Sequence, residues 1–171
     1  MIRECILLAG GLGTRLRSAV PELPKAMAPV AGKPFISYVI DSLRMQGIQR
    51  FVFALGYRHK EIEAFLTEQY PTLDYIVVIE DEPLGTGGAI QLALQKIEGE
   101  QAWVTNGDTL FKIDAAEMFK LHETTQSNCT LALKSMRHFD RYGCVKVDIA
   151  NRILSFEEKR YYEEGLINGG L

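Results

Sequence analysis

The first two thirds of the chain alternate between short, uninterrupted apolar runs and longer stretches in which apolar residues recur every three or four positions. Uninterrupted apolar runs are typical of parallel strands covered on both faces, and the longer period is typical of helices. The predicted strands are Glu4–Ala9, Phe51–Leu55, Tyr75–Ile79 and Ala102–Thr105, and the predicted helices are Pro34–Met45, His59–Glu68 and Gly88–Ile97. This part of the chain is therefore predicted to alternate strand and helix.

The pattern changes in the last third. Asp114 and Glu117 have the spacing of a capping pair and predict a helix that reaches Glu123. Three further strands are predicted after it, at Cys129–Lys134, Cys144–Val147 and Ile153–Phe156. The fold class that follows is α/β, with three α/β/α layers around a mostly parallel mixed sheet and antiparallel strands in the last third. No linker or repeat divides residues 1–171, so we expect one domain.

Composition and charge narrow the choice of partners. The 171 residues include 19 Lys and Arg against 22 Asp and Glu, a net charge of -3, which argues against nucleic acid or an anionic membrane surface as partner. No apolar stretch approaches the roughly 20 residues that span a bilayer, and the amino terminus does not resemble a signal peptide. Cys5, Cys129 and Cys144 lie in apolar runs and are odd in number, which favours buried thiols in a reducing cytoplasm.

A glycine-rich loop follows the first predicted strand, where ligands of parallel sheets bind. Gly10, Gly11 and Gly13 leave backbone N–H groups free to face an anion. The spacing matches neither a dinucleotide fingerprint nor a Walker loop, and a plain strand-to-helix turn would also use glycine. Arg15 and Lys25 on the same loop favour a triphosphate ligand, because turn geometry does not require two cations.

Asp108 follows the strand predicted at Ala102–Thr105, at the same edge of the sheet. Its carboxylate has two readings. A carboxylate beside bound phosphates is a good ligand for Mg²⁺. The sequence Asn-Gly-Asp-Thr is equally well suited to an Asx turn or a helix cap, and the residues alone leave both roles open.

Longer stretches of the chain resemble a known family. The segment from Leu8 to Leu16 (LAGGLGTRL), followed by PKAMAPV from Pro24 and by GKP from Gly32, closely resembles the signature of the sugar-1-phosphate nucleotidyltransferases. Further agreement in order and spacing is found at Glu82–Ala89, Asn106–Phe111, Tyr142–Gly143, Phe156–Lys159 and Ile167–Gly170. The Leu-Gly-Thr-Gly-Gly-Ala form most resembles the guanylyltransferases, especially the D-glycero-D-manno-heptose 1-phosphate guanylyltransferases of bacterial surface-glycan synthesis.

The resemblance implies a Rossmann-like nucleotidyltransferase fold and an Mg²⁺-assisted transfer of GMP from GTP to a heptose or mannose 1-phosphate, with release of pyrophosphate. By resemblance the catalytic residues are Arg15, Lys25 and Asp108, and Asp108 also holds the metal ion. The residues that would bind the nucleotide are Leu8, Ala9, Gly10, Gly11, Gly13, Thr14, Gly85, Thr86, Gly87 and Gly88. Those that would bind the sugar phosphate are Asp108, Gly143, Glu158, Lys159 and Asn168.

Two other functions remain open on the sequence. A uridylyl- or thymidylyltransferase would share the reaction but use another base, and a regulatory domain that binds a nucleotide sugar would share the fold without turnover. A homo-oligomer is compatible with either. In the family, the Ile-Asn-Gly-Gly stretch is followed by another strand and a second metal-binding aspartate, whereas this sequence ends at Leu171. We therefore expect a nucleotidyltransferase domain that lacks its carboxyl-terminal part.

Overall fold

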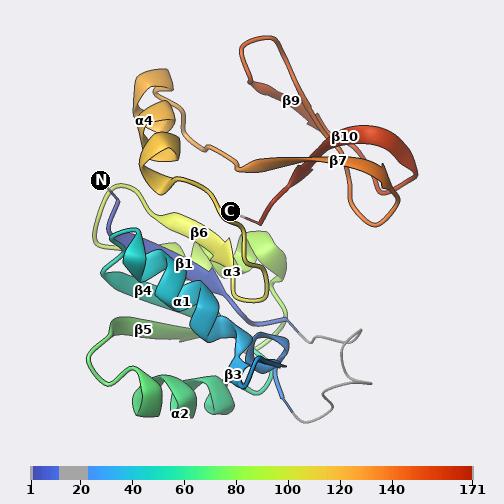
Figure 1. The fold of residues 1–171 in the computed structure, drawn as a ribbon. Helices are drawn as coiled ribbons and strands as arrows, with labels where there is room; N and C mark the ends of the chain where they lie inside the picture. Colours follow the sequence, from blue (N-terminus) through green and yellow to red (C-terminus); the bar gives the residue numbers. More distant parts are fainter. Residues whose placement is uncertain (1, 12–22, 171) are drawn as a thin grey trace. The chain divides into compact units, whose positions relative to one another are not determined.

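The computed structural model describes residues 2–11 and 23–170. The chain forms two compact units, Met1–Leu110 and Phe111–Leu171, and each contains its own four-stranded sheet (Figure 1). Among the described helices, none is long and apolar enough to cross a membrane.

Four parallel strands form the sheet of the first unit, in the order β5-β4-β1-β6. They are β1 (Glu4–Leu8), β4 (Arg50–Leu55), β5 (Asp74–Ile79) and β6 (Trp103–Asn106). The predicted parallel strands are confirmed, and all five side chains from Phe51 to Leu55 are fully buried, whereas in β5 at the edge of the sheet only Val78 is buried. The chain winds from β1 outward to β5 and then returns to the other side of β1 with β6. Strand order therefore reverses between β1 and β6, and such a switch point opens a crevice at the carboxyl ends of the strands.

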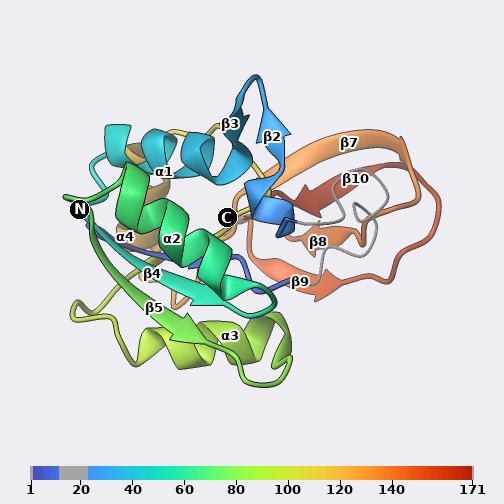
Figure 2. The ribbon, with the colours of Figure 1, turned by 90° about the horizontal axis from the view of Figure 1, so that it is seen from below.

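Helices cover both faces of this sheet, as predicted. Helices α1 (Phe35–Met45) and α2 (His59–Gln69) lie on one face and α3 (Gly85–Leu94) lies on the other (Figure 2). Ala89 and Ala93 of α3 pack on Val52 and Val78 of the sheet, which lets the helix approach closely. Before α1 the chain forms a short 3-10 helix, η1 (Lys25–Met27), and a hairpin of β2 (Pro29–Val30) and β3 (Lys33–Pro34).

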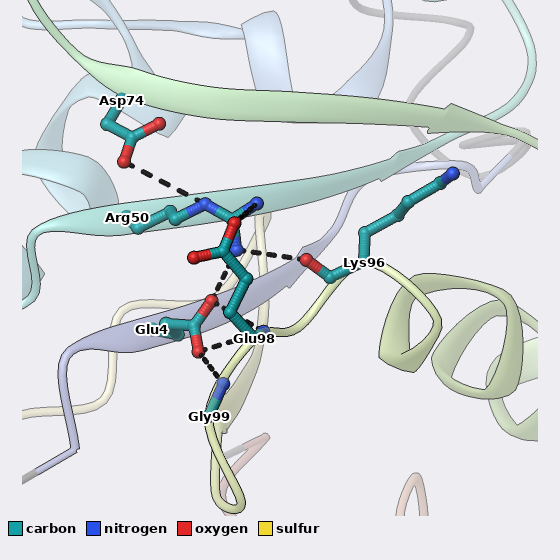
Figure 3. A network of polar contacts seen from close by, with 6 residues as sticks. All are labelled: Glu4, Arg50, Asp74, Lys96, Glu98 and Gly99. Carbon is teal, nitrogen blue, oxygen red and sulfur yellow. Dashed lines mark hydrogen bonds and ion pairs between the residues drawn. The ribbon is translucent and has the colours of Figure 1, made fainter.

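A network of charged groups holds the amino-terminal edge of the same sheet (Figure 3). Arg50 donates to Glu4 at 2.5 Å, pairs with Glu98 at 3.1 Å and lies 3.8 Å from Asp74. The Glu4 carboxylate also accepts the Gly99 N–H at 2.6 Å. Burial by itself would raise the pKa of Glu4, but these N–H donors and Arg50 outweigh it and hold that pKa below its usual value. The network ties β1 and β4 to the segment that follows α3.

The second unit contains helix α4 and an antiparallel sheet in the order β7-β10-β8-β9. Its elements are α4 (Ala115–Thr125), β7 (Leu133–Phe139), β8 (Val145–Val147), β9 (Ile153–Phe156) and β10 (Tyr162–Asn168). Asp114 caps α4 as predicted, because its carboxylate accepts the N–H groups of Ala116 at 2.9 Å and Glu117 at 3.1 Å. The predicted antiparallel strands are confirmed, and they form a sheet of their own.

Two predictions for this unit are wrong in detail. The strand expected at Cys129–Lys134 begins only at Leu133, so Cys129 lies outside the sheet and is exposed, whereas the other two cysteines are buried as expected. Strand β10 was not predicted, because its centre carries two glutamates and a glycine rather than an apolar run. Pairing with β7 along its whole length holds β10 in the sheet instead.

Helix α3 also differs from its prediction, since it begins at Gly85 rather than Gly88 and ends at Leu94 rather than Ile97. The helix ends early because the hydrogen bonds after Leu94 are of the 3-10 type. The N–H groups of Lys96 and Ile97 bond three residues back, to Ala93 and Leu94, which tightens the last turn without extending the α-helix.

Candidate active site

The segments that follow β1 and β6 lie against each other at the carboxyl edge of the parallel sheet. The N–H of Gly107, just after β6, donates to the carbonyl of Leu8 at 2.8 Å. A Cβ at Gly107 would lie 2.6 Å from the Leu7 side chain and 3.1 Å from Ala9, so any other residue would force the buried Leu7 side chain to shift. The backbone before Asp108 is therefore fixed beside the start of the glycine-rich loop.

Lys25 and Asp108 meet at this edge. Their Nζ and Oδ2 atoms are 2.6 Å apart, although 83 positions separate the two residues by their numbers. The side chains are 44% and 31% exposed, and the other Asp108 oxygen accepts the Thr109 hydroxyl at 3.2 Å. Since exposed pairs contribute little to stability, the two charges remain available to a charged ligand.

The structure allows a direct test of whether these residues fit a divalent cation. Asp108 presents a partly exposed carboxylate, the ligand type that Mg²⁺ prefers. Within residues 2–11 and 23–170, no three carboxylate, histidine or cysteine side chains gather as a preformed metal site. One carboxylate is compatible with Mg²⁺ when substrate oxygens and water complete the shell, so the residues fit a metal ion that arrives with its nucleotide.

The remaining residues predicted for the triphosphate are only partly described. Leu8 is the last residue of β1, and Ala9, Gly10 and Gly11 continue from it along the same edge. The Ala9 N–H donates to Ala54 of β4 at 2.9 Å, which extends the strand pairing by one residue. The other three predicted residues, Gly13, Thr14 and Arg15, lie outside the described residues.

The other residues predicted to bind the nucleotide, from Gly85 to Gly88, form the first turn of α3. Gly85, Thr86 and Gly87 are exposed, and a Cβ at Gly85 or Gly87 would meet no neighbour within 4 Å. Gly85 has a φ of +69°, a conformation that favours glycine. A Cβ at Gly88 would lie 2.5 Å from the Leu84 Cβ, so that glycine is required by packing.

Of the residues predicted for the sugar phosphate, Asp108 belongs to the first unit and the other four belong to the second. Asn168 ends β10, and its side-chain oxygen accepts the Gly170 N–H at 2.9 Å. Glu158 and Lys159 lie between β9 and β10, and the Glu158 carbonyl accepts the Tyr162 hydroxyl at 2.9 Å. A Cβ at Gly143 would collide with the carbonyl of the residue before Glu158. Among the described residues of the second unit, no hydrogen bond or ion pair joins the predicted side chains to one another.

One residue at the edge was not predicted. Glu80 follows β5, and its carboxylate accepts the Leu84 N–H at 3.0 Å and lies against Gly10. The sequence shows only an acidic stretch from Glu80 to Glu82, which is ordinarily read as a solvated turn. Nothing in that pattern distinguishes the one carboxylate that faces the site.

Comparisons with known proteins identify the family of the chain. The sequence pattern of the nucleotidyl transferase family matches residues 4–170, and the chain belongs to that family, as the sequence predicted. The D-glycero-alpha-D-manno-heptose 1-phosphate guanylyltransferase of Aneurinibacillus thermoaerophilus is 47% identical over 168 residues, which cover 98% of this chain and 73% of that protein. The protein of the same name from Campylobacter jejuni is 45% identical, with coverages of 98% and 74%.

Solved structures give the same result for the fold. The crystal structure of HddC from Yersinia pseudotuberculosis complexed with GMP-PN is 34% identical to this chain and has a TM-score of 0.86. The match covers 98% of this chain and 74% of HddC. The predicted nucleotidyltransferase fold is therefore confirmed.

Proposed function

We propose that this enzyme transfers GMP from GTP to a heptose or mannose 1-phosphate and releases pyrophosphate. The observation that carries the proposal is the 47% identity to a D-glycero-alpha-D-manno-heptose 1-phosphate guanylyltransferase along 98% of the chain. A mannose-1-phosphate guanylyltransferase of Mycobacterium tuberculosis, 34% identical over 157 residues, supports the same base and leaves mannose as the second sugar. A nucleotide sugar of this kind would be made in the cytoplasm for cell-surface polysaccharide.

The reaction needs charge neutralisation more than it needs a nucleophilic side chain. An oxygen of the sugar phosphate attacks the α-phosphorus of GTP, and the bond from that phosphorus to the bridging oxygen breaks as pyrophosphate leaves. Both reactants are anions, so the protein must neutralise their charge and hold the reacting atoms in line. Lys25 supplies one positive charge at the carboxyl edge of the sheet, and Arg15 is proposed to supply a second at the triphosphate.

Asp108 is proposed to hold Mg²⁺, and the ion when bound would neutralise phosphate oxygens and fix their orientation. Before substrates bind, Lys25 pairs with this carboxylate at 2.6 Å. When phosphates enter, the Lys25 ammonium can turn from Asp108 to a phosphate oxygen, because both side chains are partly exposed. The ion pair therefore keeps both charges at the site, and neither charge contributes much to the stability of the fold.

The glycines of the two loops are proposed to bind the rest of the nucleotide. Backbone N–H groups at Gly10 and Gly11, with Gly13 and Thr14 on the same loop, would face the phosphates. The turn from Gly85 to Gly88, exposed at its first three residues, offers bare backbone to the flat edge of the base and a helix start to phosphate.

The second unit is proposed to supply the sugar subsite. The subsite would be lined by Gly143, Glu158, Lys159 and Asn168. The Glu158 carboxylate would accept hydrogen bonds from sugar hydroxyls, and the Lys159 ammonium would pair with the sugar phosphate. The family pattern spans residues 4–170 and so runs through both units. We accordingly propose that the two units act as one nucleotidyltransferase domain.

The experiment that tests the proposal is a product assay over a panel of nucleoside triphosphates and sugar 1-phosphates. Purified chain is incubated with each pair and Mg²⁺, and nucleotide sugar and pyrophosphate are both quantified. GTP with D-glycero-D-manno-heptose 1-phosphate or mannose 1-phosphate should give the highest kcat/KM. A preference for UTP or dTTP would overturn the assignment of the base, and binding without pyrophosphate release in every pair would indicate a regulatory domain.

A further inference from the structure

Glu80 lies between the two loops that are proposed to bind the nucleotide. Its backbone N–H donates to the carbonyl of Leu55 at 2.9 Å, so its main chain is fixed to the end of β4. From that anchored position, one carboxylate oxygen accepts the Leu84 N–H at 3.0 Å. The other oxygen lies against Gly10, where an added Cβ would come within 2.6 Å of it.

The bond to Leu84 controls the start of α3. Leu84 is the residue before the helix, and its N–H is one of the donors that a helix start leaves without an internal partner. The Leu84 side chain in turn covers Gly88 so closely that a Cβ there would lie 2.5 Å from it. Holding Leu84 in place therefore holds the whole turn from Gly85 to Gly88.

The contact with Gly10 controls the other loop. A Cβ at Gly10 would also lie 3.3 Å from the backbone nitrogen of Gly56, so Gly10 is enclosed by Glu80 on one side and by main chain on the other. A single carboxylate thus lies against Gly10 of the phosphate loop and bonds Leu84, the residue just before the turn proposed for the base. These two segments must be held a fixed distance apart if one nucleotide is to span them.

The charge of Glu80 is a further reason to assign it a role. A carboxylate beside a loop that binds phosphates repels the ligand, and an apolar side chain would fill the same space without that cost. What an apolar side chain lacks is an acceptor for the Leu84 N–H, and an ionised acceptor makes the stronger hydrogen bond. We therefore expect Glu80 to act by fixing the geometry of the two loops.

We propose that Glu80 is a positioning residue that ties the base turn at Leu84 to the phosphate loop at Gly10 and so sets the nucleotide site to the length of GTP. It acts through the backbone of both loops and does not contact the substrate. This inference rests on the proposed function, because it assigns these two loops to one nucleotide.

The test compares Glu80→Ala with Glu80→Gln, and uses Asp81→Asn, an exposed neighbouring carboxylate, as the matched control. Loss of the acceptor in Glu80→Ala should raise the KM and the Kd for GTP about tenfold, while the KM for the sugar phosphate stays within about twofold. Glu80→Gln keeps an oxygen that accepts the Leu84 N–H, so it should remain within about threefold of the wild type for GTP. Asp81→Asn should not differ from the wild type.

A second pair of variants tests the contact with Gly10. Gly10→Ala should weaken GTP binding in the wild type, and the same change should cost less in the Glu80→Ala background, where the carboxylate no longer occupies the space. Strictly additive effects would overturn the contact. An unchanged GTP affinity in Glu80→Ala would overturn the inference, and so would equal damage from Glu80→Gln, because the charge itself would then act on the substrate.

Failure of the proposed function would look different. A wild-type chain that binds GTP by titration calorimetry but forms no GDP-sugar would refute the proposed reaction, while the GTP affinities of the variants would still decide the role of Glu80. A wild-type chain that binds no nucleotide would overturn both.

Discussion

Replacing Lys25 by alanine is expected to cost far more in turnover than in stability. The lysine is anchored locally by η1, and its ammonium has one described partner, the Asp108 carboxylate at 2.6 Å. Both groups lie at the carboxyl edge of the sheet, where the reaction is proposed to occur. The size of the two losses therefore separates a catalytic lysine from a structural one.

The magnitudes follow from exposure. With side chains 44% and 31% exposed, the ion pair is worth no more than about 1 kcal/mol of folding free energy, or about 2 to 4 °C in Tm for a chain of this size. Losing a cation that neutralises the reacting phosphates costs about 2 to 4 kcal/mol in the transition state, which is about 30- to 1,000-fold in kcat/KM. The two expected effects do not overlap.

The assay measures pyrophosphate release at saturating and limiting sugar phosphate, together with thermal unfolding of the same preparations. Lys60→Ala is the matched control, since Lys60 is an exposed lysine on α2 with no proposed role. Asp108→Asn keeps the shape of the side chain and loses its charge, so it should lower turnover and raise the Mg²⁺ concentration needed for half-maximal rate. If Lys25→Ala loses several degrees in Tm but keeps its kcat/KM, the lysine is structural and the proposed site is wrong.

Three further predictions concern the fold that carries the site. Because the pKa of Glu4 is lowered in the folded state, the stability that Glu4 contributes is complete above the unfolded pKa and is lost as pH falls through the folded pKa. Urea unfolding from about pH 6 to about pH 3 should therefore show a steeper loss of unfolding free energy for the wild type than for Glu4→Gln. Parallel curves for the two proteins would contradict the Arg50 network. Gly107→Ala should lower stability by about 1 to 3 kcal/mol and reduce turnover, because its Cβ meets Leu7 at 2.6 Å; an unchanged Tm would show that the crossing is looser than described. Asp114→Ala should cost about 1 kcal/mol in chemical denaturation by removing the cap of α4, with no such loss expected for Asp114→Asn.

The parallel sheet could be predicted from the sequence because strands that are buried on both faces appear as uninterrupted apolar runs. A segment such as Phe51–Leu55, whose side chains are all fully buried, must be apolar at every position, and its short length and aromatic residues favour a strand over a buried helix. The strands of the second unit have a weaker sequence pattern. Most side chains of β7 and β10 are at least partly exposed, so their polar residues are compatible with strand or loop, and the pairing between the two strands decides.

In the candidate site, too, some residues could be predicted from the sequence and some contacts could not. Lys25 and Asp108 could be proposed because each follows a recognisable motif and because the carboxyl ends of parallel strands share one edge. That the two charges meet directly is a property of the folded loops and could not be predicted. Glu80 is a clearer case, because its role depends on the absence of a side chain at Gly10 and on one N–H of Leu84. Such contacts involve backbone atoms, which the sequence does not distinguish.

The measurement that tests the central claim most directly is the stereochemical course at the α-phosphorus. In the proposed direct displacement, the sugar phosphate attacks at the edge occupied by Lys25 and Asp108, and no bond forms between nucleotide and protein. One diastereomer of GTP with sulfur on the α-phosphorus is converted with heptose or mannose 1-phosphate, and the configuration of the GDP-sugar is determined by phosphorus NMR. A single in-line displacement predicts inversion. Retention would reveal two displacements through a covalent guanylyl-enzyme and would contradict the account.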